Sequence, residues 1–315
     1  MKRSQALLLL AAAVLGGAWF AADGALAALD TQPGRQAATP AGAEQRDVQA
    51  YPIAGPAVLD VTAGRAAVSV EGWDRDTIEM VVTRRVGGGV FPCVGEGTWT
   101  SRAETRKLLD SVAVHADAVD NALRVRVLED ELHAAPDLSV HIAFKAPRET
   151  ALRLESGDGA LRVEGVRSGV ELRTGNGAIV AEDIAGDVRA ASGNGRILLA
   201  RISGSAHART ENGAIETEAL EGVADLKSTN GAIVATGAGA HSLRCHTANG
   251  GIRVAVDNAA PCNLDLRTEQ GGVDCALSLD QPFERQGNAL RGFLRGGGAM
   301  IALSSGNGNI HVGEG

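Results

Sequence analysis

Aromatic side chains are scarce in this chain, and so is any excess of positive charge. Phe, Trp and Tyr together make up 3% of the 315 residues, and the formal net charge is −8. Few aromatics leave little platform for stacking bases or sugar rings, and there is no broad basic field to attract phosphates. We therefore expect no nucleic-acid partner and no aromatic-lined cleft of the kind that carbohydrate enzymes use.

Motifs that carry known chemistries are also missing. The four cysteines, Cys93, Cys245, Cys262 and Cys275, form no Cys-x-x-Cys pair and no mixed Cys/His spacing typical of zinc sites. Neither Gly-x-Ser-x-Gly nor Gly-x-x-x-x-Gly-Lys occurs, so no nucleophile elbow and no phosphate-binding loop is indicated. We predict no catalytic, cofactor-binding or metal-ligating residues, no cofactor, and a protein that is not an enzyme.

The N-terminus has the pattern of an export signal. Lys2 and Arg3 precede an apolar stretch over 6–22, and Ala25-Leu26-Ala27 offers small residues to a signal peptidase. We interpret 1–27 as a cleaved signal peptide, and its rival is a retained membrane anchor. Residues 28–47 have the composition of a disordered linker, which leaves 48–315 as a single domain. The mature protein is then periplasmic or secreted, with no stable membrane span.

A tetrad of the form [Ser/Thr]-x-[Asn/Asp/Gln]-Gly recurs along most of the chain. Its copies begin at Ser156, Thr174, Ser192, Thr210, Ser228, Thr247, Thr268 and Ser305. The first four steps are 18 residues each, and the later ones are 19, 21 and 37. A period near 20 residues is typical of a solenoid, in which each repeat buries its apolar side against its neighbours.

Each repeat reads as two short strands joined by two turns. Val170, Leu172 and Thr174 alternate with polar residues, Gly175-Asn176-Gly177 turns the chain, and Ile179 resumes the alternation. One interior column is predicted to contain Leu161, Ile179, Ile197, Ile215, Ile233, Ile252 and Val273. The fold class that follows is all-β, a right-handed parallel β-solenoid with coils of about 18 residues, continuous over 152–275.

The polar columns admit two interpretations each. The turn asparagines, from Asn176 to Asn249, form either a ladder of stacked amides or a polar groove. Outward residues from Arg153 to Asp265 alternate in sign, which predicts opposite charges side by side on neighbouring coils. A second column is basic, and it either docks an acidic polymer or is simply solvated: Arg173, Arg209, Lys227, His246 and Arg267. An apolar strip containing Val180, Leu198 and Val234 is either a contact surface or covered by the chain itself.

The two ends of the chain are less regular. Alternating segments between 48 and 150 predict wider, degenerate coils of the same solenoid, and 101–110 could form one short helix. Cys93 lies on a protruding loop. Cys245 and Cys275 fall on opposing interior columns of coils that are neighbours in sequence, so a Cys245–Cys275 disulfide is our leading hypothesis. Buried thiols, or pairing with Cys262 or Cys93, are the alternatives.

The order of these parts resembles the bacterial putative-adhesin domain family of unknown function, over roughly 55–315. The matching segments are Val68 to Asp76, Val140 to Pro147, the Asn-Gly repeats and the terminal Ser305 to Ile310. The resemblance implies a right-handed parallel β-solenoid, and it brings no established reaction and no site residues.

Three functions follow from these observations. The first is an exported, non-catalytic scaffold or adhesin-like binding module whose partner is a polymer or protein of the cell envelope. The alternatives are a polysaccharide-active β-helix enzyme, which needs carboxylates clustered in a cleft, and a solenoid that polymerises through its coil ends.

Cleavage of the signal after Ala27 is directly measurable. We expect the intact mass of protein recovered from the envelope fraction to lack residues 1–27, because the small residues at 25 and 27 suit the peptidase. A mass that retains residues 1–27 would establish the membrane anchor instead.

Overall fold

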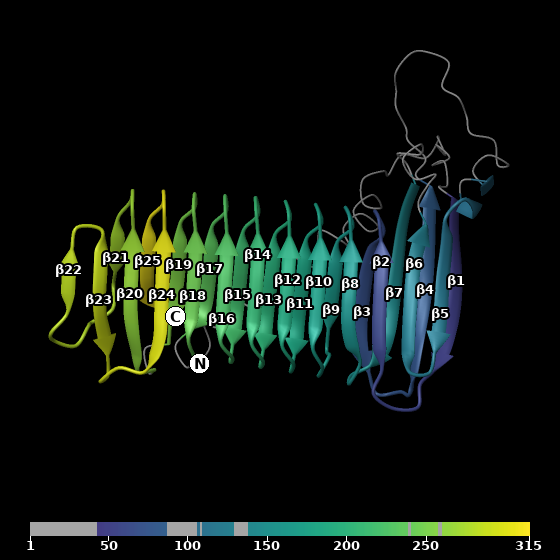
Figure 1. Ribbon diagram of the computed structural model, residues 1–315, viewed down its shortest axis with the longest axis horizontal. Helices are drawn as coiled ribbons and strands as arrows, with labels where there is room; N and C mark the ends of the chain where they lie inside the picture. The colour runs from purple at the N-terminus through teal and green to yellow at the C-terminus, as the bar shows by residue number, and fades with distance from the viewer. Residues whose placement is uncertain (1–42, 87–105, 108, 129–137, 239–240, 258–259) are drawn as a thin grey trace, which may run out of the picture. The chain divides into compact units, whose positions relative to one another are not determined.

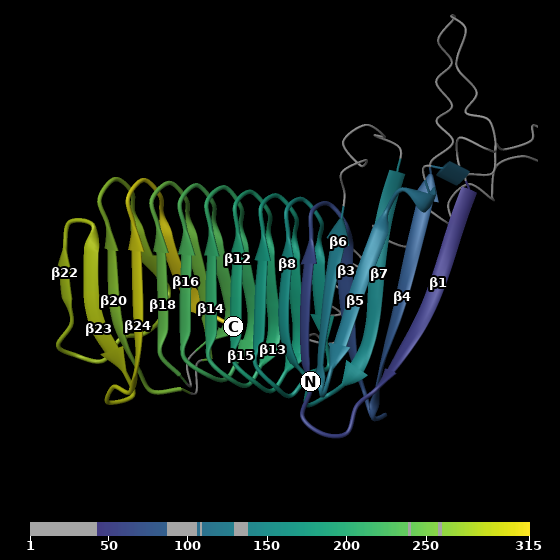
Figure 2. The same ribbon diagram turned by 45° about the vertical axis from the view of Figure 1, so that its right-hand side comes forward.

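The structure, a computed structural model, describes residues 43–86, 106–107, 109–128, 138–238, 241–257 and 260–315. The expected signal peptide and the Cys93 loop lie outside these residues. The described residues after Gly42 belong to one compact unit. They form two long sheets of 12 and 13 strands, which stack into the solenoid seen in Figures 1 and 2.

The middle of the solenoid is built from the regular repeats. In the 13-stranded sheet lie β8 (Ala151–Ser156), β10 (Val170–Thr174), β12 (Val188–Ser192), β14 (Ala206–Thr210), β16 (Ala224–Ser228) and β18 (Leu243–Thr247). In the 12-stranded sheet lie β9 (Leu161–Glu164), β11 (Ile179–Ile184), β13 (Ile197–Ile202), β15 (Ile215–Leu220), β17 (Ile233–Ala238) and β19 (Ile252–Val256). Each strand pairs in parallel with the strand one repeat away, as Val170 does with Val188.

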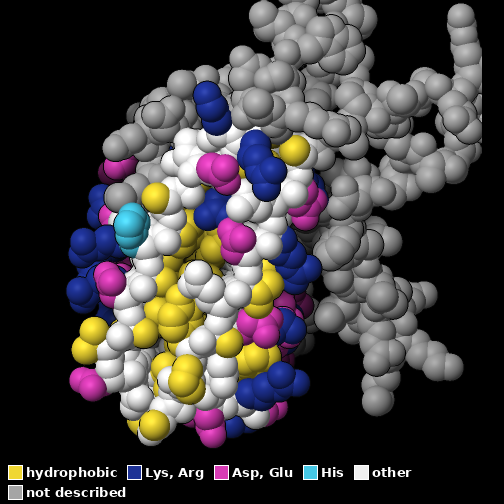
Figure 3. All heavy atoms as spheres, turned by 90° about the vertical axis from the view of Figure 1, so that its right-hand side faces the viewer, with side chains coloured by type: hydrophobic (Ala, Val, Ile, Leu, Met, Phe, Trp, Pro, Cys, Tyr) yellow, Lys and Arg dark blue, Asp and Glu magenta, His cyan; other side chains and the backbone are white. Residues whose placement is uncertain are grey.

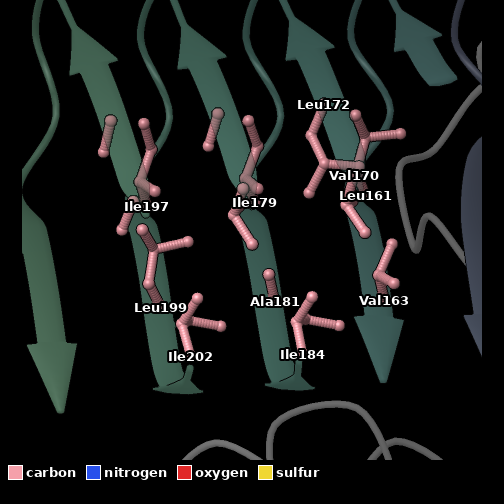
Figure 4. Close-up of a cluster of buried hydrophobic side chains, with 14 of the residues drawn as sticks. Leu161, Val163, Val170, Leu172, Ile179, Ala181, Ile184, Ile197, Leu199 and Ile202 are labelled. Atoms are coloured by element: carbon pink, nitrogen blue, oxygen red, sulfur yellow. The ribbon is translucent and has the colours of Figure 1, made fainter. Parts of the chain in front are cut away.

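The predicted interior columns are confirmed through β19. Ile179 pairs with Leu161 on one side and Ile197 on the other, and all three side chains are at most 1% exposed. Figure 4 shows these residues in one row, with Val163, Ala181 and Leu199 in the next. Burying a branched aliphatic side chain stabilises the fold by about 1.5–3 kcal/mol, so the repeated columns provide most of the driving force.

The tetrad joins successive coils through its first and third positions. The Ser192 hydroxyl accepts a hydrogen bond from the Gly195 N–H at 2.8 Å and donates to the Gly177 carbonyl of the preceding coil at 3.1 Å. The asparagines form the predicted amide ladder: Asn194 Nδ2 donates to Asn176, Asn212 to Asn194, Asn230 to Asn212 and Asn249 to Asn230. These hydroxyl and amide groups are thereby satisfied by a neighbouring coil.

The fourth position must be glycine because the coils approach too closely there for a side chain. A Cβ on Gly195 would lie 1.8 Å from the Gly177 carbonyl oxygen, and one on Gly231 would lie 1.8 Å from that of Gly213. Real Cβ atoms do not come within 3.0 Å of another heavy atom. The opposite turn has a different requirement, since Asp183, Arg201 and Ala219 all have a positive φ.

The C-terminal coils are not stacked in sequence order, which corrects the expected continuous solenoid over 152–275. The coil of β24 (Ala299–Ser305) and β25 (Ile310–Glu314) is inserted between the coil of β18 and β19 and that of β20 (Cys262–Thr268) and β21 (Val273–Cys275). Ile252 therefore pairs with Ile310, not with Val273. Figure 1 shows this inserted coil in its yellow colour. Asn307 continues the asparagine ladder from Asn249, which suits it to this place.

The N-terminal region shows a similar insertion in place of the expected degenerate coils. The coil of β2 (Val58–Ala63) and β3 (Ala67–Trp73) lies between β8 and β9 on one side and β6 (Ala122–Leu128) and β7 (Leu138–Pro147) on the other. Beyond it, β4 (Thr77–Val86) and β5 (Ala113–Val119) pair antiparallel with β7 and β6. The short turn at 120–121 makes β5 and β6 an antiparallel hairpin, because a parallel connection needs a longer crossover. The turn at 74–76 joins β3 to β4, but β7 lies between these two strands in the sheet.

The expected boundary of the linker also changes. Residues 43–47, expected in the linker, belong to β1 (Ala43–Pro52), which pairs antiparallel with β4 despite its polar sequence. The expected helix over 101–110 lies partly outside the described residues, although 106–107 and 109–110 have helical conformation. At the far end, β22 (Glu284–Gln286) and β23 (Ala289–Leu294) form an antiparallel hairpin along β20.

The predicted Cys245–Cys275 disulfide is wrong in this structure, where Cys245, Cys262 and Cys275 are all free. Cys245 pairs in register with Leu303 of the inserted coil, and this coil separates β18 from β20 and β21. Cys245 is fully buried, and burial raises the pKa of its thiol. The alternative of a buried apolar thiol fits Cys245, while Cys93 lies outside the described residues.

Substitution of a tetrad glycine tests the close approach of the coils. We expect Gly195→Ala to lower the free energy of unfolding by about 3 kcal/mol, because the new Cβ overlaps a backbone carbonyl. Gly169→Ala is the matched control, since its Cβ would meet nothing closer than 4.0 Å. Urea unfolding measures both, and equal stability of the two variants would contradict the account.

Thiol labelling tests the cysteine assignment. In the native protein we expect Cys275, which is half-buried, to react with a thiol reagent while Cys245 stays unmodified until the protein unfolds. Peptide mapping by mass spectrometry reads out both positions. Recovery of a Cys245–Cys275 cross-linked peptide would show that the inserted coil does not separate them.

Candidate functional site

Groups that could perform chemistry are dispersed over the solenoid. Among the described residues, no group of three or more His, Cys, Asp or Glu is arranged to hold a metal ion. Ser69 Oγ lies 3.0 Å from His141 Nε2, and Ser304 Oγ lies 2.8 Å from His246 Nδ1, two contacts that sequence reasoning missed. No carboxylate contacts either histidine in the described part of the chain, so neither pair has the third group that orients a catalytic base.

The resolved carboxylate pKa shifts arise from individual arginines. A bidentate hydrogen bond from Arg201 lowers the pKa of Asp183, and hydrogen bonds from Arg148 and Arg267 lower those of Asp74 and Asp265. Catalytic acids show the opposite pattern, in which burial or a neighbouring carboxylate raises the pKa. These ion pairs are structural.

The outer face of the 12-stranded sheet does not carry the continuous apolar strip expected from Val180, Leu198 and Val234. Glu216 occupies the column between Leu198 and Val234 and forms an ion pair with Arg196. The three apolar side chains are half-buried rather than exposed. A charged residue in mid-column leaves this face without an extended apolar surface.

The outer face of the 13-stranded sheet carries the two predicted charged columns. Their register is confirmed from β8 to β18, where Arg153, Glu171 and Arg189 are direct neighbours. Three of the ion pairs on this face, however, run along single strands rather than between coils. Arg173 pairs with Glu171 at 2.6 Å, Lys227 with Asp225 at 2.8 Å and Arg267 with Asp265 at 2.6 Å. Each such pair neutralises its own strand.

This pairing leaves a set of arginines on the same face without partners. Five exposed arginines make no hydrogen bond or ion pair within the described residues, and we call them the arginine band: Arg126, Arg153, Arg189, Arg209 and Arg244. They lie on β6, β8, β12, β14 and β18, so all face outward from one sheet. Sequence reasoning identified the columns but could not tell paired from free arginines.

A shallow depression of about 350 Å³ interrupts this face. It forms where the small side chain of Ala191 lies in register between Arg173 and Arg209. Glu155 and Glu211 also border it, so it is not uniformly cationic. The free arginines, rather than the depression, therefore define the charged character of the surface.

Antiparallel strands finish the N-terminal end of the solenoid and, at the other end, the 13-stranded sheet, while the 12-stranded sheet ends there in the parallel strand β21. β1 and β5 are the outermost strands at the N-terminal end, and the β22–β23 hairpin closes the 13-stranded sheet at the other. Figure 3 shows the N-terminal end, where hydrophobic side chains form a strip bordered by charged ones. Tyr51 and Val114 are among the half-buried apolar residues packed against the core at this end.

This architecture defines a class of protein: a β-solenoid with flat outer faces and hydrogen-bonded asparagine turns. The family model described as Toastrack DUF4097 matches residues 138–313. The chain belongs to this family of adhesin-like domains of unknown function, as the Asn-Gly repeats and terminal segment indicated.

Solved structures with weak overall similarity carry related descriptions. A putative cell adhesion protein from Clostridium sporogenes has 10% identity and a TM-score of 0.28, covering 87% of this chain and 100% of its own. A putative adhesin from Bacteroides fragilis has 13% identity and a TM-score of 0.34, covering 85% and 97%. One from Parabacteroides merdae has 8% identity and a TM-score of 0.25, covering 86% and 96%. No curated protein matches this chain.

Proposed function

We propose that this protein is an exported, non-catalytic binding module of the cell envelope. The observation that carries the proposal is the outer face of the 13-stranded sheet, where parallel strands hold outward side chains in fixed columns. Such a face presents many weak contacts in a rigid array, which favours an extended partner over a small molecule. Membership of the adhesin-like family supports the same role.

Export is the second element of the proposal, and residues 1–27 support it. A basic start, an apolar stretch and small residues before position 28 match a secretory signal. In the described residues, no helix is long and apolar enough to span a membrane. We place the mature protein in the periplasm or outside the cell, with an envelope polymer or protein as its partner.

The two alternative functions receive less support. A polysaccharide-active enzyme needs carboxylates gathered in a cleft, whereas Glu171, Asp225 and Asp265 each pair with an arginine or lysine on an open face. A self-polymerising solenoid needs coil ends that match each other, whereas antiparallel strands finish the N-terminal end and, at the other end, the 13-stranded sheet.

Co-sedimentation tests the binding role. We expect the processed protein to pellet with an isolated envelope fraction, and to do so in a saturable manner because the outer face offers a finite number of sites. An exported protein of similar size and acidity serves as the control. Equal recovery of both proteins in the supernatant would refute the binding module.

A further inference from the structure

We propose that the arginine band binds a linear acidic glycan whose carboxylate groups recur about every 10 Å. This rests on the binding role proposed above and names its ligand class.

The first observation that supports this inference is the charge of the surface. On β8 to β18, the outward cations are Arg153, Arg173, Arg189, Arg209, Lys227 and Arg244, and the outward carboxylates are only Glu155, Glu171 and Asp225. The face is therefore cationic on a protein whose net charge is −8.

The free arginines recur at about every second strand of the sheet, with β12 and β14 as adjacent members. In the sheet order β6, β2, β8, β10, β12, β14, β16, β18, the arginine band occupies the first, third, fifth, sixth and eighth strands. Adjacent strands lie about 4.8 Å apart, so most successive members are separated by about 10 Å across the sheet. The whole band spans about 34 Å, the length of several sugar units in an extended chain.

The intervening strands are neutral because their charges are already paired. Glu171 holds Arg173 on β10, and Asp225 holds Lys227 on β16. On β2, Asp60 pairs with Arg124 of β6 at 3.6 Å. A polymer lying across the strands would therefore meet a free guanidinium at about every second strand. A glycan in which an acidic sugar alternates with a neutral one has this periodicity.

The side-chain chemistry favours an acidic glycan over a nucleic acid. The outward positions of β6, β2 and β8 to β18 hold no Phe, Tyr or Trp on which bases could stack. A guanidinium presents a planar fork of donors that matches a carboxylate in a bidentate arrangement. Ala191 leaves space beside Arg209, so a sugar ring can approach the sheet there.

Binding of the processed protein to fluorescent hyaluronan oligosaccharides tests the proposal, because their carboxylates lie on alternate sugars. We expect binding at low salt that weakens as salt screens the charges, and no binding to neutral dextran. Arg209→Glu should reduce the affinity at least about fivefold, since it replaces an attraction with a repulsion. Arg253→Glu is the matched control, because Arg253 is exposed and has no partner in the described residues but lies on the other sheet; we expect less than about a twofold change.

Glu171→Gln should increase the affinity for hyaluronan, an effect that misfolding cannot produce. It releases Arg173 from its ion pair, so we expect tighter hyaluronan binding with an unchanged melting temperature. Equal losses of hyaluronan affinity in Arg209→Glu and Arg253→Glu would mean that binding depends only on net charge, and would refute the arginine band as the binding site. Binding to a DNA oligonucleotide as tight as to hyaluronan would overturn the glycan assignment. Envelope co-sedimentation without hyaluronan binding would refute this ligand and leave the binding module standing, whereas loss of both refutes the proposed function.

Discussion

The fold depends on how closely successive coils approach at the Asn-Gly turn. At this turn the backbone of one coil lies directly on the next, and a Cβ would come within 1.8–2.3 Å of a carbonyl oxygen at the tetrad glycines from Gly159 to Gly308. The hydroxyl of Ser or Thr and the amide of Asn then complete hydrogen bonds between coils. One constraint therefore explains three positions of the tetrad, and it keeps the apolar columns in register.

The inserted coils extend this constraint to both ends. The coil of β24 and β25 continues the tetrad contacts on both sides, because its Ser305 hydroxyl donates to the Gly250 carbonyl and its Gly308 carbonyl accepts from Thr268. At the other end Ser156 bonds to the Ala66 carbonyl of the inserted coil of β2 and β3. Segments distant in sequence thus complete the same stack, and each is fixed by partners on two sides.

The same regularity shapes the surface. Strands in fixed register hold their outward side chains in columns. The ion pairs that form within these columns then determine which charged side chains remain available to a partner. Pairing along a strand, as between Glu171 and Arg173, removes both charges from one strand and leaves arginines free on others. A flat face with periodic free charge is suited to a periodic partner. This connects the packing of the core to the binding role proposed for this protein.

The sequence by itself determined the repeat, the interior columns through Ile252, the asparagine ladder and the family. These features are local or strictly periodic, so spacing alone reveals them. Only the tertiary structure decided that Ile310 lies beside Ile252, that Cys245 is separated from Cys275, and that β1, β4 and β5 pair antiparallel. Several strands have compatible apolar patterns, and the choice among them depends on contacts between segments far apart in the chain. The arginine band also could not be predicted from the sequence, because the sequence does not show which of several nearby carboxylates pairs with a given guanidinium.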